Sequence, residues 1–387
     1  MSASPSVAGS CGGGKSVWGM VALIAAIAPA AFSVADGVTH GSVGIGGGYD
    51  TSIIGDSTGF GDAVYFAEAS VGWRGRLPGS LRSSGEASLS HEGYLKYGEE
   101  NIERGALFLD IERNLPLDFS VRLSVDGEAY IQPGYGEMNS FSGRVTPSLG
   151  WRPLEGTIIE ADIEPGHSVF PNYDLDNNRL GVGFRMIQEL GLDGELEVSW
   201  ARGTADFSER DVYSDFKATP SGVARLDRDS GLNGAISWNW GVVEVSAGYD
   251  WYKLASNGNL VDYGPGQTED SNTIFTDDQL VDDFFSNTDQ GPEASISIDV
   301  MEGFKLGVNG RMRNVVFKGQ IAKDSSDSLD LSGDIRKDTR YEVEVTAGLS
   351  MFSPAVRISW ARELSRSNHY LYDFTRDRFG VKVTSSF

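Results

Sequence analysis

The residues that could carry catalysis or bind a metal in this sequence do not have the spacing that either requires. Its four histidines show no metal-ligand spacing, and no Gly-x-Ser-x-Gly turn for a nucleophilic serine occurs. Asp174–Asn178 begins like a calcium-binding loop, but Arg179 stands where glycine is required and Arg185 where glutamate is required. We therefore expect no enzyme activity, no metal and no cofactor. The histidines are His40, His91, His167 and His369.

A nucleotide-binding pattern, G-x-x-x-x-G-K-[ST], matches Gly9–Ser16. That pattern works only between a buried strand and a helix, and here it lies inside a segment typical of an export signal. This segment holds no acid, one base at Lys15, an apolar core from Val17 to Ala28 and the small-residue exit Ser33–Ala35. The core is shorter than the roughly 20 residues of a spanning helix. We expect a signal peptide over 1–35, a mature chain over 36–387, and no nucleotide site.

The composition excludes further classes of protein. The 387 residues carry 55 acids against 32 bases, a formal charge of −23, and a single cysteine. Nucleic-acid binding needs clustered Lys and Arg, so we expect no nucleic-acid partner. One cysteine permits no disulfide within the chain. With 40% hydrophobic and 11% aromatic residues, the chain is too apolar to be an acidic disordered protein.

The mature chain shows a period of two in its apolar residues and no sustained helical stripe. The connections between these alternating segments are short and long in turn, and the long ones are polar and acidic. Short turns at one rim and long loops at the other are typical of outer-membrane barrels. The sequence therefore predicts an all-β, transmembrane antiparallel β-barrel of about sixteen strands, within a range of about fourteen to eighteen, with periplasmic termini. The clearest long connections are Thr51–Gly61, Gly93–Glu103, Gly203–Asp229, Lys253–Gln290 and Lys318–Lys337.

The two faces of each strand differ in polarity. Near residue 121, Phe119, Val121 and Leu123 alternate with Ser120 and Arg122. Because side chains cannot fill so wide a barrel, an apolar interior would stay unpacked, whereas a polar one can hold water. We expect the apolar face outside, against lipid, and closure of the sheet, since an open edge in hydrocarbon leaves backbone groups unpaired. Pro147 lies inside an expected strand, and we expect a bulge or strand end there.

Six tryptophans share the apolar parity of their strands. We expect Trp73, Trp151 and Trp238 near the short-turn ends, and Trp200, Trp251 and Trp360 near the long-loop ends. Two such rows would form the aromatic girdles of a membrane barrel.

The charged residues of the inward parity are the candidate functional residues. Acids dominate the earlier strands and bases the later ones, with two acids between the late bases. This pattern permits two interpretations. A field across a pore would steer charged solutes, or rows of opposite sign would pair across neighbouring strands and stiffen the wall. The inward set is Lys305, Arg311, Arg313, Glu342, Glu344, Arg357, Arg122, Asp126, Glu195 and Glu197.

The longest connection, Lys253–Gln290, is strongly acidic. It could fold into the mouth of the barrel as a constriction, stand outside and bind cations or a partner, or be an ordinary solvated loop. The constriction candidates are Asp277, Asp278, Asp282 and Asp283.

The end of the chain, Ser365–Phe387, contains a Ser-Asn pair at 367–368, Tyr372-Asp-Phe, Arg376-x-Arg and a terminal phenylalanine. This pattern resembles the surface lipoprotein assembly modifier barrels, and porins encoded with exopolysaccharide genes end similarly. The resemblance covers about 23 residues closely, and it implies that Phe387 is the signal read by the barrel assembly machinery. Those modifiers usually carry a helical-repeat domain before the barrel, and here only a few residues separate Ala35 from the first strand.

These observations favour an outer-membrane channel or porin-like transporter with a polar, charged lumen, in the outer membrane of a Gram-negative-type bacterium. The barrel component of a surface lipoprotein or polysaccharide export system is one alternative, and a structural or adhesive barrel is another. The expected partners are outer-membrane lipid, the barrel assembly machinery, and small solutes or an exported cargo.

Overall fold

A computed structural model of the chain describes residues 37–52, 59–134, 139–171, 175–213, 220–257, 286–321, 334–350, 354–369 and 372–387. The expected signal peptide over 1–35 and the four acidic constriction candidates lie outside these residues. Among the described residues, no helix is long and apolar enough to cross a bilayer.

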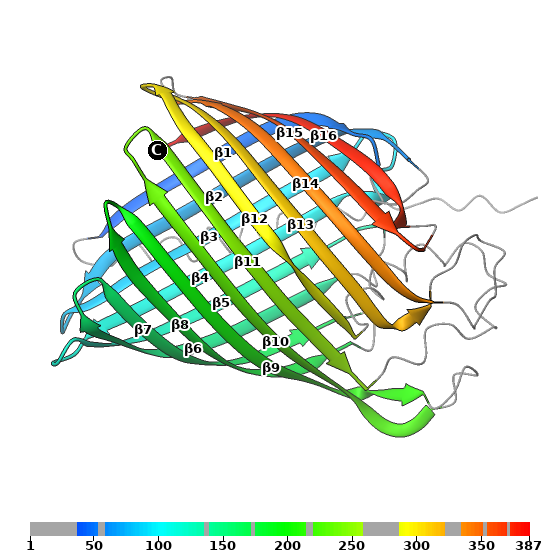
Figure 1. Ribbon diagram of the computed structural model, residues 1–387, viewed down its shortest axis with the longest axis horizontal. Coiled ribbons are helices and arrows are strands. Elements are labelled where there is room, and N and C mark those ends of the chain that lie inside the picture. Colours follow the sequence, from blue (N-terminus) through cyan, green and yellow to red (C-terminus); the bar gives the residue numbers. More distant parts are fainter. Residues whose placement is uncertain are drawn as a thin grey trace, which may run out of the picture.

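The described residues form a closed antiparallel barrel of sixteen strands, which confirms the expected fold and strand number. One short 3-10 helix, η1 (Gly98–Glu100), precedes β4. Each strand pairs with its neighbours in sequence, and β1 pairs with β16 to complete the ring (Figure 1). The strands are β1 Val38–Asp50, β2 Asp62–Leu77, β3 Leu81–Tyr94, β4 Ile102–Asn114, β5 Phe119–Ile131, β6 Ser140–Leu154, β7 Thr157–Val169, β8 Asn177–Gly191, β9 Gly194–Tyr213, β10 Pro220–Asn239, β11 Val243–Ser256, β12 Asn287–Met301, β13 Phe304–Ile321, β14 Ile335–Leu349, β15 Ala355–Ser367 and β16 Phe374–Ser386.

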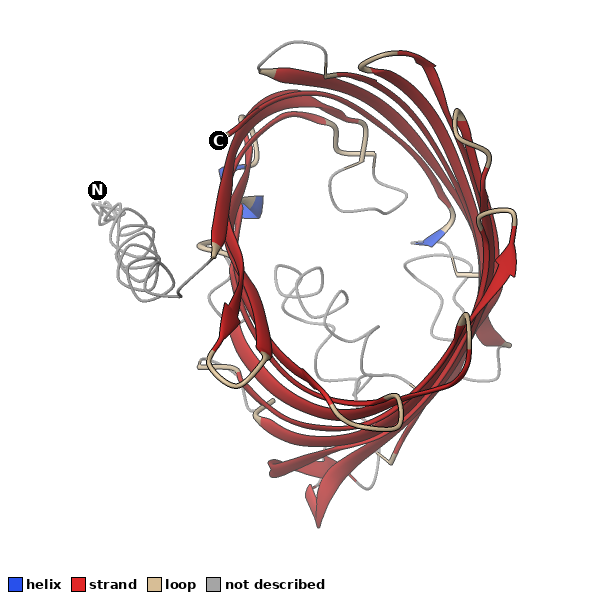
Figure 2. Cartoon of the chain, turned by 90° about the vertical axis from the view of Figure 1, so that its left-hand side faces the viewer, coloured by secondary structure: helices blue, strands red, loops and turns tan. Residues whose placement is uncertain are grey.

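All short connections lie at one rim of the ring, which faces the viewer in Figure 2, and the longer ones at the other. Several short turns use left-handed backbone conformations. In the β8–β9 turn, Leu192 and Asp193 have φ of 51° and 55°. Positive φ at both central residues is characteristic of the tight hairpin turns that match the twist of paired strands. The first residue of β1 and the last of β16 lie at this same short-turn rim.

The ladder between β1 and β16 runs from Ser42↔Ser386 to Asp50↔Arg378 without a break. Phe387 extends it, because its backbone N–H donates to the carbonyl of Gly41 at 3.0 Å and its own carbonyl accepts from the Gly41 N–H at 2.9 Å. The barrel therefore has no open edge.

Two strands extend much further than expected. The expected long connection Gly203–Asp229 is wrong, since β9 continues to Tyr213 and β10 begins at Pro220. The added stretches lack an apolar row, so their alternation is not visible in the sequence. Strand pairing continues because the neighbouring backbone provides the hydrogen bonds.

Pro147 lies inside β6, which corrects the expectation of a bulge or strand end. The β6–β7 ladder lacks pairs between Arg144↔Gly166 and Ser148↔Asp162, but the register is the same on both sides of this gap. Pro165 of β7 lies across the same gap. The two prolines thus remove hydrogen-bond donors from the β6–β7 ladder only. The β5–β6 ladder, which includes Leu123↔Pro147, stays paired.

Candidate functional site

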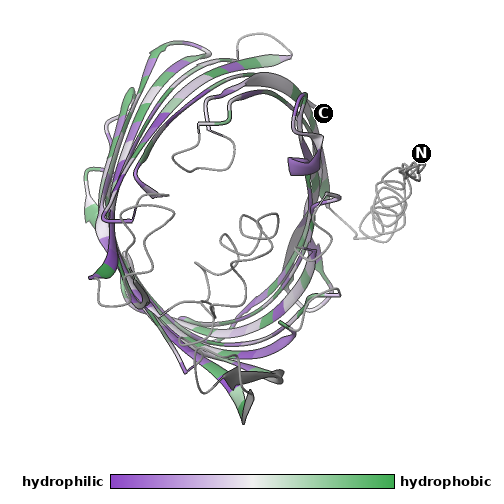
Figure 3. Cartoon of the chain, turned by 90° about the vertical axis from the view of Figure 1, so that its right-hand side faces the viewer, coloured by the Kyte–Doolittle hydropathy of each residue, from purple (hydrophilic) through white to green (hydrophobic). Residues whose placement is uncertain are grey.

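The outer face of the barrel exposes its large apolar side chains. In β5, Val121 and Leu123 are 39% and 42% exposed, and in β13 Leu306 and Val308 are equally open. Among the described residues, polar and charged side chains outnumber apolar ones in the fully buried set. Figure 3 shows the resulting alternation of hydrophilic and hydrophobic positions around the ring. This distribution is the inverse of that of a water-soluble domain, which buries its apolar side chains.

The tryptophans lie on the apolar face, but not all at the expected ends. Trp73, Trp151 and Trp238 lie near the short-turn ends of β2, β6 and β10, and Trp251 lies nearer the long-loop end of β11, as expected. Trp200 of β9 and Trp360 of β15 lie nearer the short-turn ends of their strands by residue count, but Trp200 and Trp251 lie at the same level of the ladder, both paired with Leu232 of β10.

The short-turn row of tryptophans also contains aromatic residues outside the expected set. Trp151 stacks on Phe119, with ring centroids 5.9 Å apart. Trp240, which the strand parity did not single out, stacks on Trp238 at 6.4 Å. Exposed aromatic side chains also lie toward the long-loop rim, among them Tyr49, Tyr65 and Tyr249.

Side chains of the opposite parity form ion pairs across neighbouring strands. In the earlier strands, arginines lie between the acids. Arg185 donates two hydrogen bonds to Glu197, both 2.8 Å long, and lies 3.8 Å from Glu160. Arg122 lies 3.6 Å from Glu160 and from Asp110. Carboxylates here are thus bridged by guanidinium groups in a row.

Asp126 belongs to a similar group around Arg144, at 3.6 Å, with Glu164 on the other side at 3.4 Å. Three arginines thus serve five carboxylates, so the expected excess of acid in the earlier strands is partly neutralised locally. Cross-strand pairing, one of the two interpretations of the charge pattern, accounts for these residues.

Most of the late bases are also paired, though not with the partners that the sequence suggests. The register places Arg311 beside Glu342, as expected for adjoining rows. Several of the ion pairs, however, skip a strand and join β13 to β11 or β16 to β14. The ion pairs of the late bases are Lys305 with Glu244 at 3.2 Å, Arg313 with Asp250 at 2.5 Å and with Asp289 at 4.0 Å, Arg357 with Glu344 at 3.6 Å, and Arg378 with Glu342 at 3.0 Å.

Arg313 of β13 reaches Asp250 of β11 across the intervening strand β12. The residue of β12 paired with Asp250 is Gly291, which has no side chain to obstruct the arginine. A Cβ at Gly291 would also lie 1.8 Å from the carbonyl oxygen of Met312 in β13. Glycine at this position therefore permits both the close approach of the strands and the crossing ion pair.

Two inward residues of the expected set stand apart. Within the described part of the chain, Arg311 and Glu195 make no ion pair. Arg311 lies between two acids in register, Glu293 of β12 and Glu342 of β14. Glu195, by contrast, lies opposite Glu189 of β8. The inner wall thus has fully paired stretches and a few uncompensated ones.

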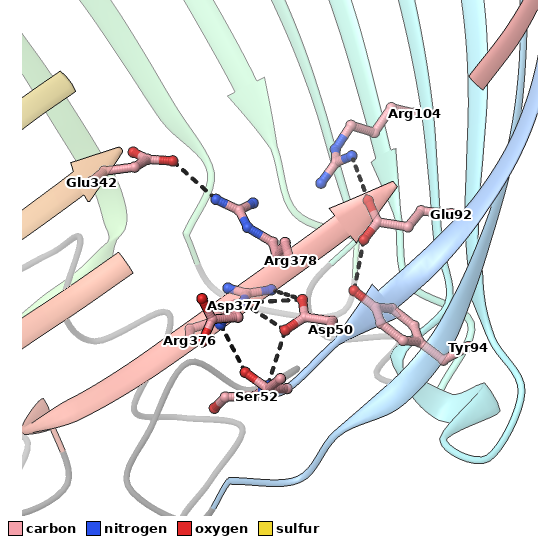
Figure 4. A network of polar contacts seen from close by, with 10 residues as sticks. Asp50, Ser52, Glu92, Tyr94, Arg104, Glu342, Arg376, Asp377 and Arg378 are labelled. Carbon is pink, nitrogen blue, oxygen red and sulfur yellow. Dashed lines mark hydrogen bonds and ion pairs between the residues drawn. The ribbon is translucent and has the colours of Figure 1, made fainter. Parts of the chain in front are cut away.

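The seam between β1 and β16 carries its own polar network near the long-loop rim (Figure 4). Arg376 of β16 donates to both carboxylate oxygens of Asp50 in β1, at distances of 2.5–3.0 Å. On the adjoining wall, the Tyr94 hydroxyl donates to Glu92 at 2.6 Å, and Arg104 lies 3.7 Å from the same carboxylate. The first and last strands are therefore joined by side chains as well as by backbone.

Two clamps of identical design lie at the long-loop ends of β10 and β14, which the sequence did not reveal. In each, an arginine binds the aspartate two residues later and lies over a phenylalanine of the preceding strand. Arg225 pairs with Asp227 over Phe207, and Arg336 pairs with Asp338 over Phe317. All four charged side chains are buried.

An asparagine completes each clamp from the strand that follows. Asn257 accepts from the Leu226 N–H at 2.7 Å and donates to the Ala224 carbonyl at 3.1 Å. Asn368 makes the same two bonds to Lys337 and Ile335, at 2.8 and 2.9 Å. The separation from arginine to asparagine is the same in both clamps. That recurring Arg-x-Asp…Asn spacing is the signal that could have revealed them.

No cluster of three or more potential metal ligands occurs among the described residues. His91 lies beside the outward-facing Tyr65, with its Nε2 at 3.4 Å from the hydroxyl. His369 packs against Tyr372 in the β15–β16 connection. The charged inner wall is thus the candidate functional surface.

No protein-family model matches the sequence, and no curated protein matches it. Among solved structures, the chain is similar to OmpT of Vibrio cholerae, with 10% identity over 91% of this chain and 97% of that one, TM-score 0.45. It is similar to CdiB from Acinetobacter baumannii, with 9% identity over 89% of this chain and 60% of that one, TM-score 0.49. It is also similar to the outer-membrane protein OpdK of Pseudomonas aeruginosa, with 10% identity over 90% of this chain and 99% of that one, TM-score 0.44. At such identities and TM-scores the likeness concerns the fold alone.

Proposed function

We propose that this chain is an outer-membrane barrel that forms a channel for small polar solutes. The observation that carries the proposal is the polarity of the two faces of a closed sheet. The outer face exposes large apolar side chains such as Val121 and Leu306, and the inner face carries rows of ion pairs. Exposed apolar side chains around a whole ring are stabilised by acyl chains, and inward charges are stabilised by water in a lumen.

The two rims support an orientation for the barrel. Short turns and both strand termini at one rim, with long connections at the other, suit a periplasmic short-turn rim and an outer long-loop rim. Aromatic residues such as Trp151 and Trp238 near the short-turn ends would then lie at the periplasmic boundary between the outer membrane and water, where indole rings are favoured. The C-terminal Phe387 remains the residue we propose for recognition by the barrel assembly machinery.

Planar-bilayer recording tests the channel directly. The refolded full-length chain should give discrete ion-conductance steps, whereas the same detergent without protein should give none. Circular dichroism of the same sample would confirm its β-structure. If a chain with that β-structure gives no steps at any voltage, it is not a channel.

A second candidate, the barrel component of surface lipoprotein or polysaccharide export, rests on the residue pattern of 365–387. Part of that pattern has a role in the fold, because Asn368 bonds to the backbone of β14. Deletion of the gene in its own host separates the candidates. An export component should lose a surface lipoprotein or polysaccharide from intact cells and should conduct no ions. A structural or adhesive barrel should show neither effect.

A further inference from the structure

Three arginines on the inner wall near the short-turn rim have no carboxylate partner among the described residues. Arg74 and Arg76 lie in β2, and Arg82 lies in β3. Within the described residues none of the three forms an ion pair, although most inward arginines of this barrel do. This place is therefore an exception to the local neutralisation found elsewhere on the wall.

The register makes the exception more pronounced. Arg76 lies directly opposite Arg82 across the β2–β3 ladder, and Arg74 lies opposite Ser84. Like charges facing each other on neighbouring strands destabilise a sheet. A local arrangement that costs stability without a compensating contact is characteristic of functional positions.

The same side chains line a cavity of about 480 Å³. The acids of its wall do not balance the bases. Asp110 is already engaged, since it accepts a hydrogen bond from Ser124 at 2.8 Å and lies 3.6 Å from Arg122. Glu112 of β4 lies opposite Arg82 of β3 and is the one lining carboxylate that forms no ion pair among the described residues. The lining residues are Arg74, Gly75, Arg76, Arg82, Ser83, Ser84, Asp110 and Glu112.

We propose that this cavity binds the oxyanion of a small solute, a carboxylate or phosphate group, at the short-turn mouth of the barrel. Guanidinium groups bind both oxyanions through paired N–H donors. A bound oxyanion would supply the charge that Arg76 and Arg82 lack from the protein. The binding site stands on its own geometry, whereas its use in transport rests on the proposed channel.

Isothermal titration calorimetry of the refolded full-length chain in uncharged detergent tests the site, with inorganic phosphate and succinate as separate probes. At least one probe should bind saturably, and the tighter one identifies the group preferred. The double variant Arg76→Gln/Arg82→Gln should weaken binding at least about tenfold, because two charge-assisted contacts are lost. It should fold, since it removes a like-charge pair.

Two further variants make the result specific. Arg152 of β6 lies near the same rim and does not line the cavity, so Arg152→Gln should leave the affinity within about twofold. Glu112→Gln should raise the affinity, because it removes the one uncommitted carboxylate. No binding of either probe, equal weakening by Arg152→Gln, or weaker binding after Glu112→Gln would each overturn the site.

The binding site and the channel can fail separately. Conductance without saturable anion binding removes the site and leaves the channel. Saturable binding that depends on Arg76 and Arg82, in a chain that conducts no ions, keeps the site and removes the channel.

Discussion

Gly291 determines how closely two strands approach, so its replacement should be costly. In Gly291→Ala the new methyl group would meet the Met312 carbonyl, and β12 and β13 would have to separate. We expect a loss of about 1–3 kcal/mol in the free energy of unfolding, the usual cost of overpacking. Urea unfolding of the refolded barrel, followed by tryptophan fluorescence, measures this loss.

Gly310 of β13 is the matched control, because a Cβ there meets no atom within 4 Å. Gly310→Ala should change the free energy of unfolding by less than about 0.5 kcal/mol. Equal losses in the two variants would mean that loss of glycine in any strand, rather than crowding at Met312, is responsible.

At the residue scale, strand parity could be predicted from the sequence, whereas the partners of charged side chains could not. The alternation of Val121 with Arg122 was enough to separate the two faces. The pairing of Arg313 with Asp250 depends on two further conditions, the register of three strands and the glycine between the two side chains. A period of two carries no information on either.

At the element scale, the Arg–Asp–Asn clamps should fasten the long-loop ends of β10 and β14. In Asn368→Ala, the Lys337 N–H and the Ile335 carbonyl lose their side-chain partner. We expect amide hydrogen exchange near Lys337 to accelerate about thirtyfold, since two bonds worth about 1 kcal/mol each are lost. Hydrogen-exchange mass spectrometry of the refolded barrel measures this.

The second clamp provides the control for the first. Asn257→Ala should accelerate exchange near Leu226 and leave Lys337 unchanged, and Asn368→Ala should do the reverse. If either variant accelerates exchange near both Leu226 and Lys337, or near neither, the two clamps do not stabilise their strand ends independently.

Element ends were the least predictable part of the fold. The sixteen strands could be predicted because one face of each is apolar over most of its length. The outer parts of β9 and β10 could not, since polar residues such as Thr204, Arg228 and Asp229 occupy both faces there. Where both faces of a strand are polar, backbone pairing continues without a signal in the side chains.

At the scale of the whole molecule, a paired base and an unpaired base of the lumen should have the same effect on ion preference and different effects on stability. If the chain conducts, Arg311→Gln and Arg313→Gln should both shift the ion preference towards cations, because each removes a positive charge from the lumen. The reversal potential in a KCl gradient measures the shift. An unchanged reversal potential in Arg311→Gln would place that residue away from the ion path.

Only one of these two changes should lower stability. Arg313→Gln leaves Asp250 and Asp289 without their cation, and we expect a loss of about 2 kcal/mol in the free energy of unfolding. Arg311 makes no ion pair within the described chain, so Arg311→Gln should unfold like the unaltered barrel. Urea unfolding of the two variants side by side tests this difference.

The ladder between β1 and β16 is antiparallel, like those between successive strands, and β1 begins and β16 ends at the short-turn rim. The finished sheet is therefore a cycle in which no hairpin has a privileged position. A circular permutation that links these two ends and opens another short turn, such as 78–80, would preserve every strand pairing. The order in which the strands are synthesised would change, and the proposed assembly signal at Phe387 would lie inside the chain.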